Sequence, residues 1–280
     1  MIMQKYSIPR SSEYHIPVIK GYIRMKGIKG FLIDLDGVLY VGDTAIEGAH
    51  EAVGLLRKRK YRYRFVSNTT RKCRRTIVER LSGMGFDISE EEVITPPVAA
   101  NAYMKNTGKE QCYLLVTGDA ERDFEQTCVC TPGERIDCVI IGDAGDSISY
   151  NRLNTAFRYL MNGAELIALE KDRYWMAPDG LSLSAGPFVT ALEFATGKKA
   201  TIIGKPSKAF FDRALDEIGL RPCQVAMIGD DIITDIAGAY RVGMKSILVK
   251  TGKYRKDAVK NSVIKPTYCI DSLAHLSEIL

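Results

Sequence analysis

From residue 30 onwards, short apolar runs alternate with segments whose apolar residues recur at helical spacing. Runs such as 31–35 and 138–141 have the length of buried strands, whereas 48–59 and 208–218 have the period of amphipathic helices. Strands that alternate with helices predict βαβ units and a parallel sheet. The number of runs exceeds what one small sheet needs, so we expect two α/β domains.

The composition of the 280 residues is that of a soluble globular chain, with 46% hydrophobic and 26% charged residues. No apolar run approaches the roughly 18–20 residues that span a bilayer, so no membrane segment is expected. The net charge of +5 does not by itself indicate nucleic-acid binding. We interpret the basic run 57–64 as a helix C-terminus that enters a strand, rather than as a patch for a phosphate backbone.

Seven cysteines and three histidines lack the spacing of a zinc site. Reduced, mostly buried thiols in a cytoplasmic protein are the simplest expectation, and the role of the close pair Cys128 and Cys130 stays open. Residues 1–24 have neither clear periodicity nor the apolar stretch of a secretory signal. We interpret them as a loosely attached N-terminal extension.

Two carboxylates, Asp34 and Asp36, stand where the first predicted strand ends, and Gly37 follows them. In open parallel sheets, ligands bind beyond the carboxyl ends of strands, and side chains two positions apart start on the same face. The pattern also resembles part of a calcium-binding loop. Aligned on Gly37, however, that loop would place Leu32, which has no side-chain oxygen, at its first ligand position.

Two further segments supply groups that suit an anion. Ser67 and Asn68 follow the second predicted strand, where hydroxyl and backbone N–H groups can bind an anionic oxygen. An ordinary helix N-cap would use the same residue types. Lys205 stands between Gly204 and Pro206 on a constrained loop, although a single lysine is more often a solvated surface charge.

A second acidic group, Asp230, Asp231 and Asp235, follows another apolar strand. Three carboxylates within six residues at the start of a helix suit a hard divalent cation, although Asp231 or Asp235 could instead cap the helix. Ile-Gly-Asp also occurs at 141–143, but no further acids follow it at helical spacing. We therefore interpret Asp143 as a loop residue of the middle domain.

Taken together, the order of these segments resembles the haloacid dehalogenase-like (HAD) hydrolase superfamily, whose members are mostly phosphatases. The resemblance covers nearly the whole chain after residue 28 and is similar to the NagD-type branch, subfamily IIA. The segments that carry it are 34–39, 67–70, 204–206 and 229–235. Segments 186–193 and 250–255 resemble the subgroup that contains phospholysine phosphohistidine inorganic pyrophosphate phosphatase.

The resemblance implies an α/β fold, a Rossmann-like doubly wound parallel sheet with an inserted α/β cap. Residues 25–106 and 200–280 would form the hydrolase core. The insertion, residues 107–199, resembles a cap domain of the C2 type. Residues 1–24 would precede both.

The resemblance also implies roles for the carboxylates. Asp34 would attack phosphorus and form an aspartyl-phosphate, which splits one difficult step into two. Asp36 would protonate the leaving group and then take a proton from the attacking water, which needs a raised pKa. Mg²⁺ would be held by Asp34, the backbone carbonyl of Asp36 and Asp230.

The remaining motif residues would surround the phosphate. Ser67, Asn68 and Lys205 would bind it, and Lys205 would also neutralise the charge on the nucleophile. Asp231 and Asp235 would act through water or hold Lys205 in place.

The expected substrate is a small phosphorylated metabolite, and a homodimer through the cap is a further expectation from the resemblance. Neither a nucleic acid nor a membrane is expected as a partner. In the cap, Lys171 and Arg173 would favour an acidic leaving group if their loop approaches the substrate. Alternatively, the loop is solvated and Trp175 packs beneath it.

Other classes compete with this interpretation. A receiver-like signalling module also combines acids, a hydroxyl and a lysine, but it is shorter and does not turn over phosphate. A dinucleotide-binding protein would need a glycine-rich fingerprint after the first strand, where Asp36 and Gly37 stand instead. A dehalogenase is disfavoured by Asp36, and a pyrophosphate or phosphoamidate hydrolase of the same superfamily stays possible.

Overall fold

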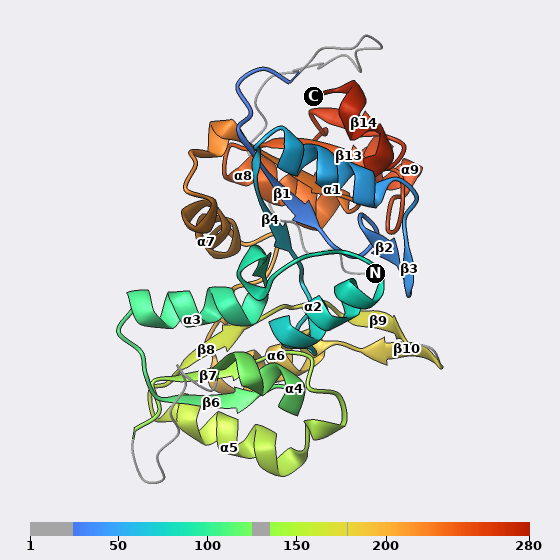
Figure 1. Cartoon of the computed structure of the whole chain (residues 1–280). Coiled ribbons are helices and arrows are strands. Elements are labelled where there is room, and N and C mark those ends of the chain that lie inside the picture. The colour runs from blue at the N-terminus through green and yellow to red at the C-terminus, as the bar shows by residue number, and fades with distance from the viewer. Residues whose placement is uncertain (1–24, 125–134, 178) are drawn as a thin grey trace.

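The computed structural model describes residues 25–124, 135–177 and 179–280 (Figure 1). Its larger sheet has parallel strands in the order β14-β13-β12-β1-β4-β5. These strands are β1 (Gly30–Asp34), β4 (Arg62–Val66), β5 (Val93–Ile94), β12 (Val225–Gly229), β13 (Lys245–Val249) and β14 (Tyr268–Ile270). The predicted N-terminal extension, 1–24, and the pair Cys128 and Cys130 lie outside the described residues.

The strand order changes direction at β1. The chain continues from β1 to β4 and β5 on one side, and later returns to place β12, β13 and β14 on the other side. In open α/β sheets, such a switch point opens a crevice beyond the carboxyl ends of the strands. The fold therefore puts its natural binding crevice next to Asp34, the last residue of β1.

Helices cover both faces of this sheet, so the predicted doubly wound α/β fold is confirmed. Alternate residues of β1 enter different apolar clusters: Phe31 and Ile33 lie with α1 (Ala49–Lys58) and α2 (Arg74–Gly83). Leu32 lies in the cluster of the other face. The helices of that face are α3 (Pro96–Asn106), α7 (Lys208–Ile218) and α8 (Ala237–Arg241).

The middle of the chain forms a second parallel sheet, in the order β11-β8-β7-β6 (lower half of Figure 1). One face packs in a cluster with α5 (Tyr150–Met161) and α6 (Ala185–Thr196). The strands are β6 (Cys112–Leu115), β7 (Cys138–Ile141), β8 (Glu165–Ala168) and β11 (Thr201–Ile202). The strand β11, which lies just after residue 199, pairs with β8 at the edge of this sheet.

Three further elements lie outside the two parallel sheets. An antiparallel hairpin, β9 (Tyr174–Ala177) and β10 (Gly180–Leu183), leaves the cap. A shorter hairpin, β2 (Tyr40–Val41) and β3 (Thr44–Ala45), follows the first acidic motif. The helix α9 (Lys256–Asn261) precedes β14.

Core and cap share an apolar cluster. Cys112 and Ile140 of the cap sheet belong to the same cluster as Ala100 of α3 and Phe210 of α7. Phe124, which follows the short cap helix α4 (Gly118–Glu121), is fully buried in it. Since apolar surface is removed from water between the two parts, the cap rests on α3 as a packed layer.

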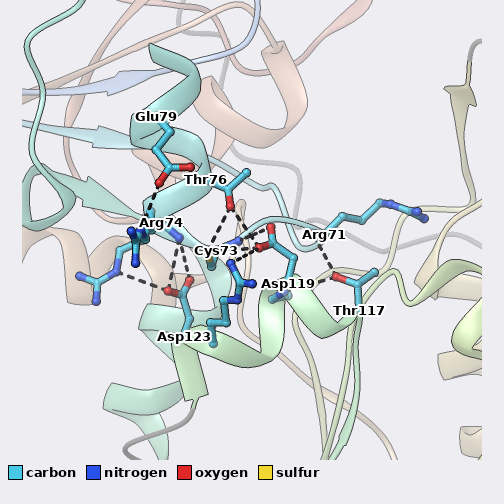
Figure 2. Close-up of polar contacts among 11 residues, drawn as sticks. Arg71, Cys73, Arg74, Thr76, Glu79, Thr117, Asp119 and Asp123 are labelled. Atoms are coloured by element: carbon cyan, nitrogen blue, oxygen red, sulfur yellow. Dashed lines mark hydrogen bonds and ion pairs between the residues drawn. The ribbon is translucent and has the colours of Figure 1, made fainter. Parts of the chain in front are cut away.

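Polar contacts join the same two parts at the start of α2 (Figure 2). The N-cap residue of α2, Cys73, makes no side-chain capping hydrogen bond. Instead, Asp119 of the cap accepts from the Cys73 N–H at 3.2 Å and from the Thr76 hydroxyl at 3.1 Å, and Asp123 accepts from the Arg74 N–H at 3.2 Å. A core helix is therefore capped by carboxylates of the cap domain, which also suit its positive end.

The sequence periodicity predicted several elements of core and cap within one or two residues, including β7 and α7. The helix expected to start at the acidic group of Asp230, Asp231 and Asp235 is divided, into a π-helical turn at Ile232–Ile236 and α8. The basic run ends α1 and enters β4, as expected. The helix α3, the helix α6 and the hairpin β9–β10 were not predicted.

Cysteine chemistry differs from the prediction in part. The thiols of Cys73, Cys138, Cys223 and Cys269 are free, but Cys223 and Cys269 are exposed rather than buried. Cys112 is disulfide-bonded, so the prediction of reduced thiols throughout is wrong for this residue. No helix in the described part of the chain combines the length and the apolar character that crossing a membrane requires.

We expect Asp119→Ala to destabilise the protein by about 1–3 kcal/mol, because it removes a helix cap and leaves partly buried donors unpaired. Urea denaturation measures this change. The control is Asp146→Ala, which removes an exposed carboxylate of the cap domain and should change the free energy of unfolding by less than about 0.5 kcal/mol. Equal effects of the two substitutions would show that Asp119 does not join core to cap.

Candidate active site

Three neighbouring strands bring the motif residues to one edge of the core sheet. Asp34 ends β1, Ser67 follows β4, and Asp230 follows β12. Because β1 pairs in parallel with both β4 and β12, these side chains arrive at the same end of the sheet. Asp34, Ser67 and Asp230 are all buried, with exposed fractions of 8%, 4% and 2%.

Lys205 lies at the centre of the site. Its ammonium Nζ is 2.7 Å from Asp34 Oδ1 and 2.7 Å from Asp235 Oδ1. Burial opposes the charge of this lysine, but Asp235 and then Asp34 outweigh it, so the pKa of Lys205 is raised. The lysine therefore stays cationic next to the predicted nucleophile.

The side-chain amide of Asn68 holds the lysine loop in place. Asn68 Nδ2 donates to the Lys205 carbonyl at 2.9 Å, and the Lys205 N–H donates to Asn68 Oδ1 at 2.7 Å. A Cβ on Gly204 would collide with the backbone carbonyl of Leu169, just after β8, and crowd the Asn68 amide, so glycine lets the loop approach. The amide of Asn68, predicted to line the phosphate site, is thus bonded to the Lys205 backbone.

Ser67 closes a tight turn directly after β4. Its hydroxyl Oγ donates to Thr69 Oγ1 at 2.9 Å and accepts from the Thr69 N–H at 3.1 Å. The single hydroxyl proton of Ser67 is thus donated within the turn, and the predicted contact to a phosphate oxygen would replace Thr69 as its acceptor.

The carboxylates of Asp34, Asp230 and Asp235 gather so closely that one ligand atom from each lies within 4.8 Å of the others. Burial, and after it the charge of Asp34, raises the pKa of Asp230 to about 6. Three buried carboxylates face one buried lysine, which leaves an excess of negative charge. Since hard divalent cations prefer oxygen ligands, this residue set fits Mg²⁺.

Asp36 lies beside this cluster but keeps its side chain exposed to solvent. Partial removal from water, and after it the charge of Asp34, raises the pKa of Asp36. A raised pKa lets a carboxyl group hold a proton closer to neutral pH, as a general acid must.

Asp231 and Asp235, which follow Asp230 in the chain, have different structural roles. Asp231 caps the π-helical turn, where its Oδ1 accepts from the N–H groups of Ile233 at 2.7 Å and Thr234 at 3.2 Å. Asp235 is fully buried and pairs with Lys205. Burial raises the pKa of Asp235, and the ammonium of Lys205 opposes that rise. Asp231 therefore acts as a helix cap, which was one of the two alternatives, whereas Asp235 holds Lys205 in place.

Sequence analysis missed Lys253. Its backbone N–H donates to Asp230 Oδ2 at 2.6 Å. Partial burial opposes its charge, but Asp34 and then Asp230 raise the pKa of the Lys253 side chain, so this lysine adds positive charge to the site. The signal was available: Lys253 follows β13, the strand next to β12, and the strand-end argument used for Asp34 applies to it equally.

Asp143 was predicted as a loop residue, and it follows β7 without regular structure, but it is buried and joins cap to core. Its Oδ1 is 3.1 Å from Arg71 Nη1, and its N–H donates to Thr70 Oγ1 at 3.2 Å. Arg71 also lies over the Trp175 ring, 5.6 Å from its centroid. The loop that begins at Ser67 is therefore attached to the cap.

The cap loop that carries Lys171, Arg173 and Trp175 fits in part the alternative in which it is solvated. Lys171 Nζ is 2.7 Å from Glu193 Oε2 within the cap, so this ammonium is already paired. The neighbouring Glu170 accepts from the hydroxyl of Ser184 and the N–H of Ala185, at the start of α6. Trp175 packs under Arg71 and keeps 37% of its surface exposed.

Gly37 offers a direct test of the acidic cluster. Its φ of +82° disfavours other residues, and a Cβ there would collide with Asp230 Oδ2. We expect Gly37→Ala to displace this carboxylate and abolish the stabilisation that added Mg²⁺ gives in a thermal-unfolding assay. Gly42→Ala is the control, since its φ is +57° but nothing lies within 4 Å. Gly42→Ala should cost about 1–2 kcal/mol of stability and retain the stabilisation by Mg²⁺. Loss of that stabilisation in both variants would contradict the assignment of a cation site at Asp230.

Comparisons with known proteins identify the family of the chain. Residues 31–128 match the family model for haloacid dehalogenase-like hydrolases, and residues 202–276 match a second model described as HAD-hydrolase-like. Phospholysine phosphohistidine inorganic pyrophosphate phosphatase of Homo sapiens is 41% identical over 263 residues, which cover 92% of this chain and 96% of that protein.

Solved structures share the whole architecture. 4-Nitrophenylphosphatase from Thermotoga maritima superposes with a TM-score of 0.83 at 28% identity, over 90% of this chain and 97% of that one. NagD from E. coli has a TM-score of 0.83 at 23% identity, over 90% and 99%, which supports the fold alone. The predicted resemblance to the NagD-type branch is confirmed, and the chain belongs to the haloacid dehalogenase-like hydrolases.

Proposed function

We propose that this protein is a Mg²⁺-dependent phosphatase that hydrolyses a small phosphorylated metabolite through an aspartyl-phosphate. The observation that carries the proposal is the buried Lys205, 2.7 Å from Asp34, with the exposed Asp36 two residues further along the chain. A phosphoryl group is anionic and repels nucleophiles, so its transfer needs nearby positive charge and a fixed nucleophile. The pairing of Lys205 with Asp34 supplies both.

In the first step, an oxygen of Asp34 forms a bond to phosphorus while the bond to the leaving oxygen breaks. Asp36 gives its proton to that leaving oxygen. In the second step, water attacks the aspartyl-phosphate, and Asp36 takes a proton from the water as phosphate and free Asp34 are released. The raised pKa of Asp36 supports this change between acid and base.

The other residues bind and orient the phosphoryl group. Lys205 neutralises charge on its oxygens, and Ser67 donates a hydrogen bond to one of them. Asp34, Asp230 and the backbone carbonyl of Asp36 would hold Mg²⁺, which, when bound, stabilises negative charge on the phosphoryl oxygens. Asp235 keeps Lys205 in position through their 2.7 Å ion pair.

Asp34→Asn should abolish turnover of 4-nitrophenyl phosphate, because an amide does not attack phosphorus. Lys205→Ala should lower kcat by roughly 10²-fold or more, as removal of other charge-stabilising donors does. Steady-state assays with and without Mg²⁺ measure both effects. Acid quenching followed by mass spectrometry should find phosphate on Asp34 of the wild type. Normal turnover by Asp34→Asn would refute the nucleophile assignment.

Two alternatives give different results in the same assays. A receiver-like module without turnover would accept phosphate on Asp34 but release no nitrophenol beyond one equivalent. A pyrophosphate or phosphoamidate hydrolase, the activity named for the human relative, would cleave those substrates with a higher kcat/KM than phosphate monoesters. A screen of phosphorylated compounds therefore separates the three.

We also propose a homodimer through the cap. In the hairpin β9–β10, Leu183 pairs with Tyr174 and Leu181 pairs with Met176, so all four side chains lie on one face. Each is more than half exposed, and the face carries no charge. A two-stranded hairpin is only marginally stable alone, and a second copy would cover the apolar face with an identical uncharged one.

The double substitution Met176→Ser and Leu181→Ser should convert a dimer into a monomer, measured by sedimentation velocity at a fixed concentration. The control is Phe194→Ser, which removes a 91% exposed aromatic ring from α6 outside the hairpin and should leave the dimer intact. A monomeric wild type, or a double variant that stays dimeric, would exclude this interface. The cytoplasmic location remains a proposal, supported by the free thiols of Cys73, Cys138, Cys223 and Cys269, whereas the disulfide of Cys112 does not support it.

A further inference from the structure

We propose that a small cationic cavity beside Asp36 binds a second negative charge, carried by the leaving group of the substrate. The cavity has a volume of about 190 Å³ and is lined by Tyr40, Thr69, Lys72, Thr76, Ile77 and Arg80. This inference rests on the proposed phosphatase function, because it assigns the leaving-group side of that site.

The cavity lies at the mouth of the active site. Its Tyr40 wall forms a β-bridge with Asp36, and the Gly37 N–H donates to the Tyr40 carbonyl at 2.7 Å. On the opposite wall, Thr69 is hydrogen-bonded to Ser67. The cavity is thus bracketed by the residue that would protonate the leaving oxygen and by the turn that would bind the phosphoryl group.

The two cations of the cavity are held in different ways. Arg80 stacks over the Tyr40 ring, 4.8 Å from its centroid, and its Nη2 is 2.8 Å from Asp43 Oδ1. Arg80 also donates to the Gly42 carbonyl at 2.6 Å and, through Nε, to Asp43 Oδ1 at 3.2 Å, so its guanidinium is anchored to the turn between β2 and β3 and forms a fixed wall of the cavity. Lys72 forms no ion pair within 4.0 Å with any residue that the structure describes, so its charge is available.

One acid whose pKa responds to the charge of Lys72, Asp119, is already hydrogen-bonded. Burial opposes the charge of Asp119, but hydrogen bonds from Cys73 and Thr76, drawn in Figure 2, and the charge of Lys72 lower its pKa. These bonds fix the first turn of α2, immediately after Lys72. The backbone donors at this helix end are taken by the cap, and the ammonium of Lys72 remains the group that can meet an anion.

Size and charge together define the ligand. At about 190 Å³, the cavity is smaller than the roughly 300–1,000 Å³ of sites for drug-sized ligands. It therefore suits one small charged group, a carboxylate or a second phosphoryl group. Of the two cap cations expected from the sequence to favour an acidic leaving group, Lys171 and Arg173, the first is paired with Glu193. We assign this part to Lys72, which directly precedes the N-cap of α2.

A matched pair of substrates tests the assignment: phosphoglycolate and 2-hydroxyethyl phosphate, which differ in whether the leaving group ends in a carboxylate or a neutral hydroxyl. Wild-type kcat/KM should be higher for phosphoglycolate. Lys72→Ala should lower kcat/KM for phosphoglycolate by roughly 10- to 100-fold, mainly through KM, as loss of a charged hydrogen bond does. It should leave 2-hydroxyethyl phosphate nearly unchanged.

Two further variants separate charge from structure. Lys72→Arg should restore most of the preference for phosphoglycolate. Arg75→Ala removes a 72% exposed cation three residues further along the chain, on α2, where it is paired with Glu79. This variant should change kcat/KM for neither substrate. Equal losses on both substrates, no loss on either, or a wild type without preference would overturn the inference while the phosphatase function stands. If the wild type hydrolyses neither these substrates nor 4-nitrophenyl phosphate, the proposed function itself fails.

Discussion

The site is organised around the ion pairs of one buried lysine. Lys205 lies 2.7 Å from both Asp34 and Asp235, which come from different ends of the chain. Without the lysine, two buried carboxylates would face each other in a poorly solvated place, where like charges are strongly unfavourable. The same ammonium that makes this cluster stable also lies where a phosphoryl group needs positive charge, so stability and function depend on the same contacts.

The cap shares in this arrangement because it is attached to the catalytic loops. Asp143 contacts Thr70 and Arg71, only a few residues after Ser67, and Asp119 caps α2 from the cap side. The common apolar cluster around Phe124 adds a non-polar contact between the two sheets. A substitution in the cap can therefore alter the shape of the phosphate site without touching the substrate.

The sequence predicted the elements whose causes are local. The strand ends carrying Asp34, Ser67 and Asp230 follow from short apolar runs, and their meeting at one edge follows from parallel topology. Contacts between distant segments could not be predicted from the sequence. Periodicity does not show that Asn68 is hydrogen-bonded to the Lys205 backbone or that Asp119 caps α2. The apolar face of β9–β10 is a property of strand pairing, which no single run shows.

Asp36 lies between two groups of side chains with opposite charge. On one side, Asp34, Asp230 and Asp235 make an acidic cluster that suits a divalent cation. On the other side, Lys72 and Arg80 line a cavity open to a small anion. Since both ends of a substrate with a phosphate and a second negative charge are negative, these charges alone do not fix its orientation, and the acidic cluster repels the phosphate unless a bound cation offsets it. The short contact between Lys205 and Asp34 marks where the phosphate would be held, and Lys72 could then meet the second negative charge beyond Asp36.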